Sequence, residues 1–199
     1  RALAEDKKKP VLVFCEDVAA SGGYMIACAG DEIYAAQTSI IGSIGVISVR
    51  QVLEQLLERA GIGVNVTKSG EFKDMGALWR EATPEEQQKM QELLDDTYSS
   101  FVAIVAQSRG MDEDTVRELA TGEVYLADRA LELGLVDELG DLDRAIDIAA
   151  ELSGAPRNPV FLRPRRGLRE RLFGPMAESV VQAVAEQVEQ RLWHGRLRL

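Results

Sequence analysis

Ser21 lies where a serine hydroxyl could act as a nucleophile. A strand-forming run at residues 11–14 ends a few positions before it, and Gly22 and Gly23 open a segment of small and apolar residues after it. This pattern predicts that Ser21 sits at a strand-to-helix turn. The first N–H groups of a helix have no intrahelical acceptor, so they could stabilise an oxyanion there. The alternative is that Ser21 only caps the helix, because serine is a preferred N-cap residue.

A nucleophilic serine needs a proton acceptor, which is usually a histidine. The one histidine, His194, stands five residues from the C-terminus and is a poor candidate. The remaining choice is a lysine whose amine is kept neutral by burial. Lys73 is the candidate: it follows a β-rich run at residues 61–66 and is expected at the end of a strand. The alternative is a solvated surface charge, as most lysines are.

Three separated motifs resemble those of the signal peptide peptidase A (SppA/SohB) family, bacterial serine peptidases that use a Ser/Lys dyad. In chain order these motifs are Ala20-Ser21-Gly22-Gly23-Tyr24, Ile41-Gly42-Ser43-Ile44-Gly45-Val46 and Ser69-Gly70-Glu71-Phe72-Lys73. The likeness extends from about residue 10 to about residue 140. The spacing of the serine and the lysine is similar to that in short, single-domain members.

The resemblance implies a role for each of four residues. Ser21 matches the nucleophile, and Lys73 matches the general base. Ser43, in the Gly-Ser-Ile-Gly motif, matches the serine that hydrogen-bonds the lysine amine and orients it. The backbone N–H of Gly22 is the expected donor to the oxyanion. The same resemblance implies an α/β fold of the ClpP/crotonase type, with crossover helices on a parallel-type sheet.

The resemblance also implies partners and a location. Short members of the family form rings whose sites take the serine and the lysine from adjacent subunits, so a homo-oligomer with shared active sites is expected. The implied substrates are cleaved signal peptides and other unfolded polypeptides at the bacterial cytoplasmic membrane, on its extracytoplasmic side. Family members usually carry a membrane anchor or export signal, and a Pro-Gly-Gly segment before the nucleophile. Neither occurs in this sequence, so we expect a fragment that lacks its anchor and one oxyanion donor.

The hydrophobic pattern predicts alternating strands and helices, which favours parallel pairing. Strands are expected at residues 11–14, 31–36 and 46–49, and an amphipathic crossover helix at 51–60. A long helix begins at a Thr83 cap followed by Pro84 and continues to Ser108. Its apolar stripe predicts core or subunit interface: Met90, Leu93, Leu94, Tyr98, Phe101 and Val105. Shorter helices are expected at residues 112–119, 127–133 and 142–152.

Charge divides the chain unevenly. The net charge is −10, yet the residues from 155 onward carry nine basic against four acidic side chains. We expect a peptidase domain at residues 1–152, a Pro/Arg-rich linker at 153–168 and a basic amphipathic helix at 169–199. That helix could lie on an anionic membrane surface or dock against an acidic neighbouring subunit. Nucleic acid is disfavoured, because the main body is acidic and the tail lacks interleaved aromatic residues.

Cofactor and metal chemistry are disfavoured by the composition. Cys15 and Cys28 are too few for a disulfide framework and are expected to be buried free thiols. The acidic pairs and triplets, among them Glu85-Glu86, look like solvated helix faces and caps, and no phosphate-binding glycine loop occurs. Two rival functions remain: a crotonase-like acyl-CoA enzyme, and a noncatalytic membrane-associated scaffold with the same fold.

Overall fold

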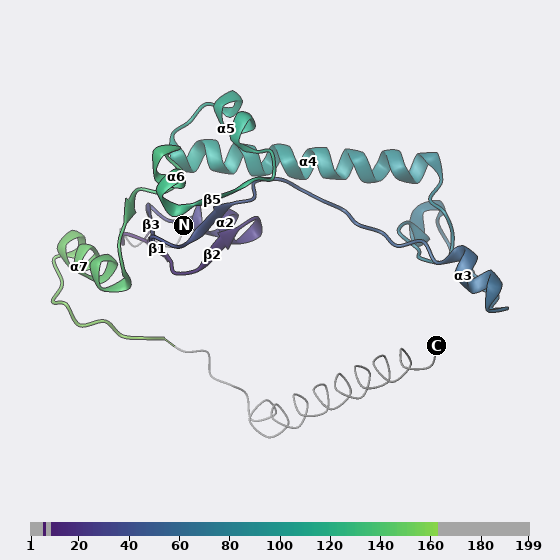
Figure 1. Cartoon of the computed structure of the whole chain (residues 1–199), viewed down its shortest axis with the longest axis horizontal. Helices are drawn as coiled ribbons and strands as arrows, with labels where there is room; N and C mark the ends of the chain where they lie inside the picture. The colour runs from purple at the N-terminus through teal and green to yellow at the C-terminus, as the bar shows by residue number, and fades with distance from the viewer. Residues whose placement is uncertain (1–5, 7–8, 163–199) are drawn as a thin grey trace, which may run out of the picture. The chain divides into compact units, whose positions relative to one another are not determined.

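The structure is a computed structural model that describes residue 6 and residues 9–162 (Figure 1). Residues up to Arg157 belong to one compact unit, and residues 158–162 are irregular and exposed. Arg157 pairs with Asp143 and Asp147 of the last described helix. The predicted helix at 169–199 lies outside the described residues, and the division into three domains stays a prediction.

Two three-stranded sheets lie at the centre of the compact unit. The first has the order β1 (Leu12–Cys15), β3 (Glu32–Ala35), β6 (Glu138–Leu139), and all its strands are parallel. The second has the order β2 (Val18–Ala20), β4 (Ile40–Gly42), β5 (Val124–Leu126); β2 and β4 are parallel, and β5 is antiparallel to β4. The predicted α/β architecture with parallel pairing is confirmed.

The chain passes from the first sheet to the second at Glu16, between β1 and β2. The hydroxyl of Ser39, which is fully buried, lies 2.7 Å from the Cys15 carbonyl oxygen and 2.9 Å from that of Glu16. Buried carbonyl groups need such donors where the strand ladder is interrupted. Ser39 therefore joins the start of β4 to the bend that precedes β2.

Five α-helices accompany the sheets in the described residues. Their bounds are α2 (Gly22–Ala27), α4 (Pro84–Arg109), α5 (Glu113–Leu119), α6 (Ala127–Glu132) and α7 (Leu142–Ser153). The predicted start of α4 is confirmed, because Thr83 and Glu86 form a reciprocal capping box with Pro84 in the first turn. Gly110 ends α4 in the left-handed conformation, with a φ of 64°.

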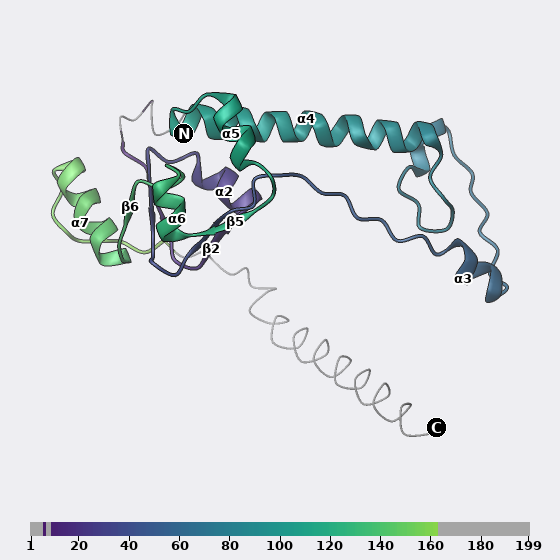
Figure 2. The same ribbon diagram turned by 45° about the horizontal axis from the view of Figure 1, so that its top comes forward.

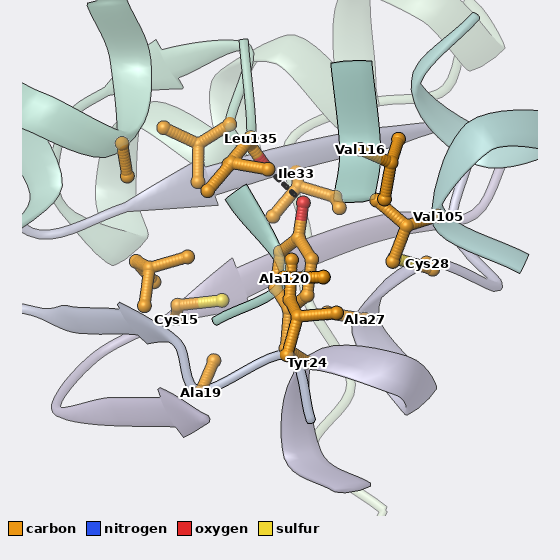
Figure 3. Packing of buried hydrophobic residues seen from close by; sticks show 14 of the residues in the cluster. Cys15, Ala19, Tyr24, Ala27, Cys28, Ile33, Val105, Val116, Ala120 and Leu135 are labelled. Carbon is orange, nitrogen blue, oxygen red and sulfur yellow. Dashed lines mark hydrogen bonds between the residues drawn. The ribbon is translucent and has the colours of Figure 1, made fainter. Parts of the chain in front are cut away.

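One core joins the sheets to α2, α5, α6 and the C-terminal half of α4. Tyr24 of α2 is fully buried in it and donates a hydrogen bond of 2.8 Å to the Leu135 carbonyl, drawn as a dashed line in Figure 3. Cys15 and Cys28 are buried free thiols, as predicted, and burial raises the pKa of both. Both thiols therefore stay protonated at neutral pH.

An ion pair joins the end of α4 to the sheet. The guanidinium of Arg109, only 7% exposed, donates to both carboxylate oxygens of Asp137 at 2.9 and 2.6 Å and to the Gly134 carbonyl at 2.8 Å. Asp137 also accepts the backbone N–H of Ile33 at 2.7 Å. One carboxylate therefore connects α4, β3 and the segment that leads into β6.

We call residues 46–83 the arm. It carries one more α-helix, α3 (Glu54–Arg59), and a 3-10 turn, η1 (Glu71–Asp74). Figures 1 and 2 show α3 near the N-terminal end of α4, away from α2 and the sheets. The predicted strands at 46–49 and 61–66 are wrong, since neither run is a strand. α3 is not a crossover helix either, because none of its residues is buried.

The arm departs from prediction because strand propensity measures how well a residue fits a sheet, and a strand forms only with a partner. The runs at 46–49 and 61–66 have the right residues, but no strand lies next to them in the part of the chain that the structure describes. The predicted apolar stripe of α4 is likewise only partly buried. Phe101 and Val105 are buried in the core, whereas Leu93 is 56% exposed.

Replacement of Tyr24 by phenylalanine should test the hydrogen bond in the core. The Tyr24→Phe variant keeps the ring but leaves the buried Leu135 carbonyl without its donor. We expect the free energy of unfolding to fall by about 1–3 kcal/mol, measured by urea denaturation. The matched control is Tyr125→Phe, whose hydroxyl makes a longer bond of 3.3 Å from a half-buried position. Equal losses in both variants would contradict the assignment.

The Asp137 carboxylate should make stability depend on pH. Burial acts to raise its pKa, but hydrogen bonds from Arg109 and from the Ile33 N–H outweigh burial and hold the pKa below its ordinary value. Because the pKa is lowered in the folded state, the contribution is complete above the unfolded pKa of about 3.9. It is lost as pH falls through the folded value.

We therefore expect Asp137→Asn to lower the free energy of unfolding by about 1–2 kcal/mol at pH 7, a value reduced because the side chain is 37% exposed. Urea denaturation should show the gap to the wild type narrowing as pH is lowered from 4 toward 2. Glu113→Gln, which removes an exposed pair with Arg117, is the control and should change stability by less than about 0.5 kcal/mol. A difference in unfolding free energy that does not depend on pH would contradict the role given to the Asp137 carboxylate.

Candidate active site

Ser21 sits between β2 and α2, so the predicted strand-to-helix turn is confirmed. Its N–H donates to the Gly42 carbonyl at 2.7 Å, and its own carbonyl accepts the Met25 N–H at 3.0 Å. Its side chain makes no capping hydrogen bond, although it occupies the N-cap position. The interpretation of Ser21 as a capping side chain is therefore wrong. The residue is exposed, and its hydroxyl is not engaged in a hydrogen bond that caps α2.

Ser43 directly follows β4, the neighbour of β2. The register pairs Ala20 with Gly42 in parallel strands, so the next residues, Ser21 and Ser43, leave the same edge of the sheet side by side. The N–H of Ser43 donates to the Glu123 carbonyl at 2.7 Å. Parallel pairing thus brings together two of the residues predicted from the sequence.

Both serines have backbone conformations that cost energy. In the part of the chain that the structure describes, the non-glycine residues with positive φ are Ser21, at 52°, and Ser43, at 49°. Such conformations cost on the order of 1–3 kcal/mol each and persist where surrounding contacts impose them, frequently at functional sites. The two outliers coincide with the two serines singled out from the sequence.

A cleft of about 760 Å³ opens over the two serines. Its lining includes Ser21, Gly22 and Ser43, so three of the four predicted site residues share one cavity. Sequence reasoning missed the rest of the wall, which comes from Met25, residues 45–47, Thr97, Tyr98 and Phe101 of α4, and residues 120–122. Residues 120–122 could have been found from the Thr121-Gly122 pair, which lies in the region that resembles the family. Tyr98 was predicted only as part of the apolar stripe of the long helix.

The backbone beside Ser21 is open. A Cβ atom added at Gly22 or Gly23 would meet no atom within 4 Å, and both residues are exposed. These glycines are therefore not required by packing within the chain. Their lack of a side chain leaves the first N–H groups of α2 accessible to a molecule in the cleft.

Lys73 is not brought to this cleft by its own chain. It lies in η1 rather than at the end of a strand, so that part of the prediction is wrong, and its side chain is exposed. The neighbouring Asp74 is tied through Arg80 to Glu86, in the first turn of α4, whereas α4 contributes Tyr98 to the cleft. Tyr98 lies twelve positions after Glu86, which is about 18 Å along the helix axis.

Within residues 9–162, no group of three or more His, Cys, Asp or Glu side chains is placed to hold a metal ion. Among the helices that the structure describes, none combines the length and the apolar character needed to cross a bilayer.

Comparisons with known proteins match most of the chain to peptidases. The model of peptidase family S49 matches residues 3–155. A candidate protease of Synechocystis sp. is 40% identical over 185 residues, which is 92% of this chain. The chloroplastic serine protease SPPA of Arabidopsis thaliana is 37% identical over 79% of this chain. A Haemophilus influenzae protein named "Probable protease SohB" is 39% identical over 67% of it.

The matched region is a part of each relative. The chain spans 66% of the Synechocystis protein, 23% of the Arabidopsis protein and 37% of the Haemophilus protein. The family model nevertheless covers the sheets, α2 to α7 and the cleft that holds both serines. The chain therefore belongs to peptidase family S49, with relatives of the SppA and SohB types.

Proposed function

We propose that this chain is a serine endopeptidase in which Ser21 of one subunit is paired with Lys73 of an adjacent subunit. The single observation that carries the proposal is the conformation of Ser21 and Ser43. Both serines are strained, both lie at one sheet edge, and both line the same cleft. Strain of this kind is maintained where exact placement of a side chain matters for chemistry.

The arm supplies the reason for a shared site. Lys73 is held at the end of α4 remote from its own Ser21, and it is exposed where a second subunit could cover it. A neighbouring body packed on the arm would remove water from the amine and favour its uncharged form, which a general base requires. A homo-oligomer with its sites between subunits agrees with this geometry.

The reaction follows from the placement of the groups. The Ser21 hydroxyl attacks the carbonyl carbon of the scissile peptide bond, and its proton passes to the Lys73 amine. The N–H of Gly22 donates to the oxyanion as it forms. Collapse of the tetrahedral intermediate breaks the C–N bond, and the leaving amine takes the proton back from Lys73. Water, deprotonated by Lys73, then attacks the ester carbonyl carbon; the C–O bond to Ser21 breaks, and Lys73 returns the proton to the Ser21 oxygen. In this scheme Ser43 orients the amine through a hydrogen bond.

The cleft supports a peptide as the substrate. Apolar and aromatic residues, among them Met25, Tyr98 and Phe101, line the same cleft as the two serines. Such a lining accepts apolar side chains of an extended polypeptide. We propose as substrates cleaved signal peptides and other unfolded polypeptides. We place the enzyme at the bacterial cytoplasmic membrane, on its extracytoplasmic face, and assign its domain a fold of the ClpP/crotonase type.

Subunit mixing tests the dyad and the shared site together. We expect Ser21→Ala and Lys73→Ala each to lower kcat by about 10⁴-fold or more, measured with a fluorogenic peptide that has apolar residues before the scissile bond. Co-expression of the two variants in equal amounts should restore about a quarter of the wild-type activity, because random assembly pairs an intact serine with an intact lysine at that frequency. Mixing that restores nothing would overturn the shared site.

A fluorophosphonate probe separates the peptidase from its two rivals. An activated serine attacks this probe, whereas an acyl-CoA enzyme or a noncatalytic scaffold has no such serine. We expect wild-type protein to be labelled at Ser21, identified by peptide mass spectrometry, and Ser21→Ala to remain unlabelled. Ser99→Ala, which removes an exposed serine of α4, is the control and should label normally. Absence of labelling in an assembled wild-type protein would contradict the peptidase and favour one of its two rivals.

A further inference from the structure

Four charged side chains form a continuous network at the N-terminal end of α4. Arg80 makes a bidentate pair with Glu86, with 2.7 Å between Nη1 and Oε2. Its Nε also donates to Asp74 at 3.1 Å. Asp74 also accepts from a second cation, the Lys68 amine, at 2.6 Å. We call Lys68, Asp74, Arg80 and Glu86 the arm network.

The two carboxylates of the arm network are better shielded from water than the Lys89–Glu92 pair on the same helix. The side chain of Glu86 is 4% exposed and that of Asp74 is 10% exposed, whereas Lys89 and Glu92 form a pair that is about half exposed. The expectation that Glu85-Glu86 belongs to solvated helix faces and caps is therefore right about the cap, which Glu86 forms with Thr83, and wrong about the solvation of Glu86. Sequence reasoning missed the pairing because Arg80 precedes the helix and approaches it through the fold of the arm.

Both carboxylates of the network stay ionised at neutral pH. A hydrogen bond from Arg80 lowers the pKa of Glu86 to about 2. Hydrogen bonds from Arg80 and Lys68 also lower the pKa of Asp74 well below its ordinary value. Since both values are lowered in the folded state, the pairs persist above the ordinary carboxyl range and are lost only in strong acid. An activity assay between pH 6 and 9 leaves the network intact.

The network encloses the turn that carries Lys73. Asp74 is the last residue of η1, and the Lys68 amine also donates to the Glu71 carbonyl, at the first residue of η1, at 2.8 Å. Both ends of this four-residue turn, which includes Lys73, are therefore tied to the same cation.

The same network is built into the start of α4. Oε2 of Glu86 accepts the backbone N–H of Thr83 at 3.0 Å and the Arg80 guanidinium at 2.7 Å, so one carboxylate both caps the helix and holds the arm. Arg50 adds a second brace by donating to the Ala77 carbonyl at 3.0 Å and to the Arg80 carbonyl at 3.3 Å.

Hydrogen bonds and ion pairs take the place of a core in this region. α3 has no buried residue, and the large apolar side chains Ile62, Val64 and Phe72 are exposed. Without a packed interior, the position of η1 relative to α4 depends on directional contacts. Arginine suits this task, since its planar guanidinium can bind two carboxylates in fixed geometry.

We propose that Arg80 is a positioning residue for catalysis: through Asp74 and Glu86 it sets where the Lys73 amine enters the active site of the adjacent subunit. This inference rests on the proposed Ser21/Lys73 pair. A displacement of a reacting group by about 1 Å can cost about 100-fold in rate. Loss of Arg80 therefore affects the chemical step and leaves the cleft around Ser21 intact.

Arg80→Gln tests the proposal in the full-length, assembled protein. We expect kcat to fall about 100-fold and KM to stay within about twofold, because the substrate cleft lies on the other subunit's body. Arg80→Lys should recover only part of the loss, since lysine keeps the charge without the fork. The matched control is Arg129→Gln, which removes an exposed pair with Glu132 and should leave kcat unchanged.

Complementation assigns Arg80 to one partner of the shared site. Co-expressed with Ser21→Ala, which has an intact arm, Arg80→Gln should regain about a quarter of the wild-type activity. Co-expressed with Lys73→Ala it should regain none, since no subunit then offers a correctly placed lysine. The opposite outcome is activity regained when Arg80→Gln is combined with Lys73→Ala. If Ser21→Ala and Lys73→Ala still complement each other, that result would overturn only the positioning role of Arg80. Failure of that parent pair would instead overturn the proposed shared site.

Hydrogen exchange tests the structural part without using activity. In Arg80→Gln we expect faster amide exchange in residues 68–76 and unchanged exchange in the core strands β1 and β3. Faster exchange throughout the protein would indicate general destabilisation and would contradict a local positioning role. Unchanged exchange in residues 68–76 would show that Arg80 does not hold the turn, which also contradicts the proposal.

Discussion

The parallel pairing of β2 with β4 is the constraint on which the site depends. It sets Ala20 opposite Gly42, and the bond from the Ser21 N–H to the Gly42 carbonyl continues the ladder by one residue. The next residues on both strands are serines, so the register alone places two hydroxyls at one edge. A slip of one residue in either strand would turn its serine away from the other serine. The buried hydroxyl of Ser39 secures the bend before β2 and helps to hold this register.

The arm and the body, by which we mean the sheets with α2, α5, α6 and the C-terminal half of α4, are stabilised by different physical means. The body has an apolar core centred on Tyr24, Ile33 and Phe101, and the buried Arg109–Asp137 pair ties the end of α4 to the sheet. The arm relies on the network around Arg80 and on caps at the start of α4. A core resists displacement in every direction, whereas a few directional bonds fix one chosen geometry. α4 belongs to both regions and carries the Lys73 turn at a fixed distance from the cleft.

Exposed apolar residues gather in the arm and near the serine turn. Ile62, Val64 and Val66 alternate along an unpaired run in the arm, and Val18 and Ile26 are exposed beside the serine turn. Apolar surface of this extent on a lone chain favours association. In the proposed function this association also brings the lysine of one chain to the serine of another, so assembly and activity depend on the same contacts.

Local sequence signals determined the elements whose partners are near or whose ends are marked by residue type. The start of α4 followed from Thr83, Pro84 and the acids after them, and the turn at Ser21 followed from a strand run and two glycines, because capping and turn formation depend on a few adjacent residues. The tertiary structure alone decided the positive φ of Ser21 and Ser43, the pairing of Arg80 with Glu86, and the absence of strands at residues 46–49 and 61–66. Strain, burial and strand pairing are set by groups distant in the chain, and a sequence pattern cannot show whether such a partner is present.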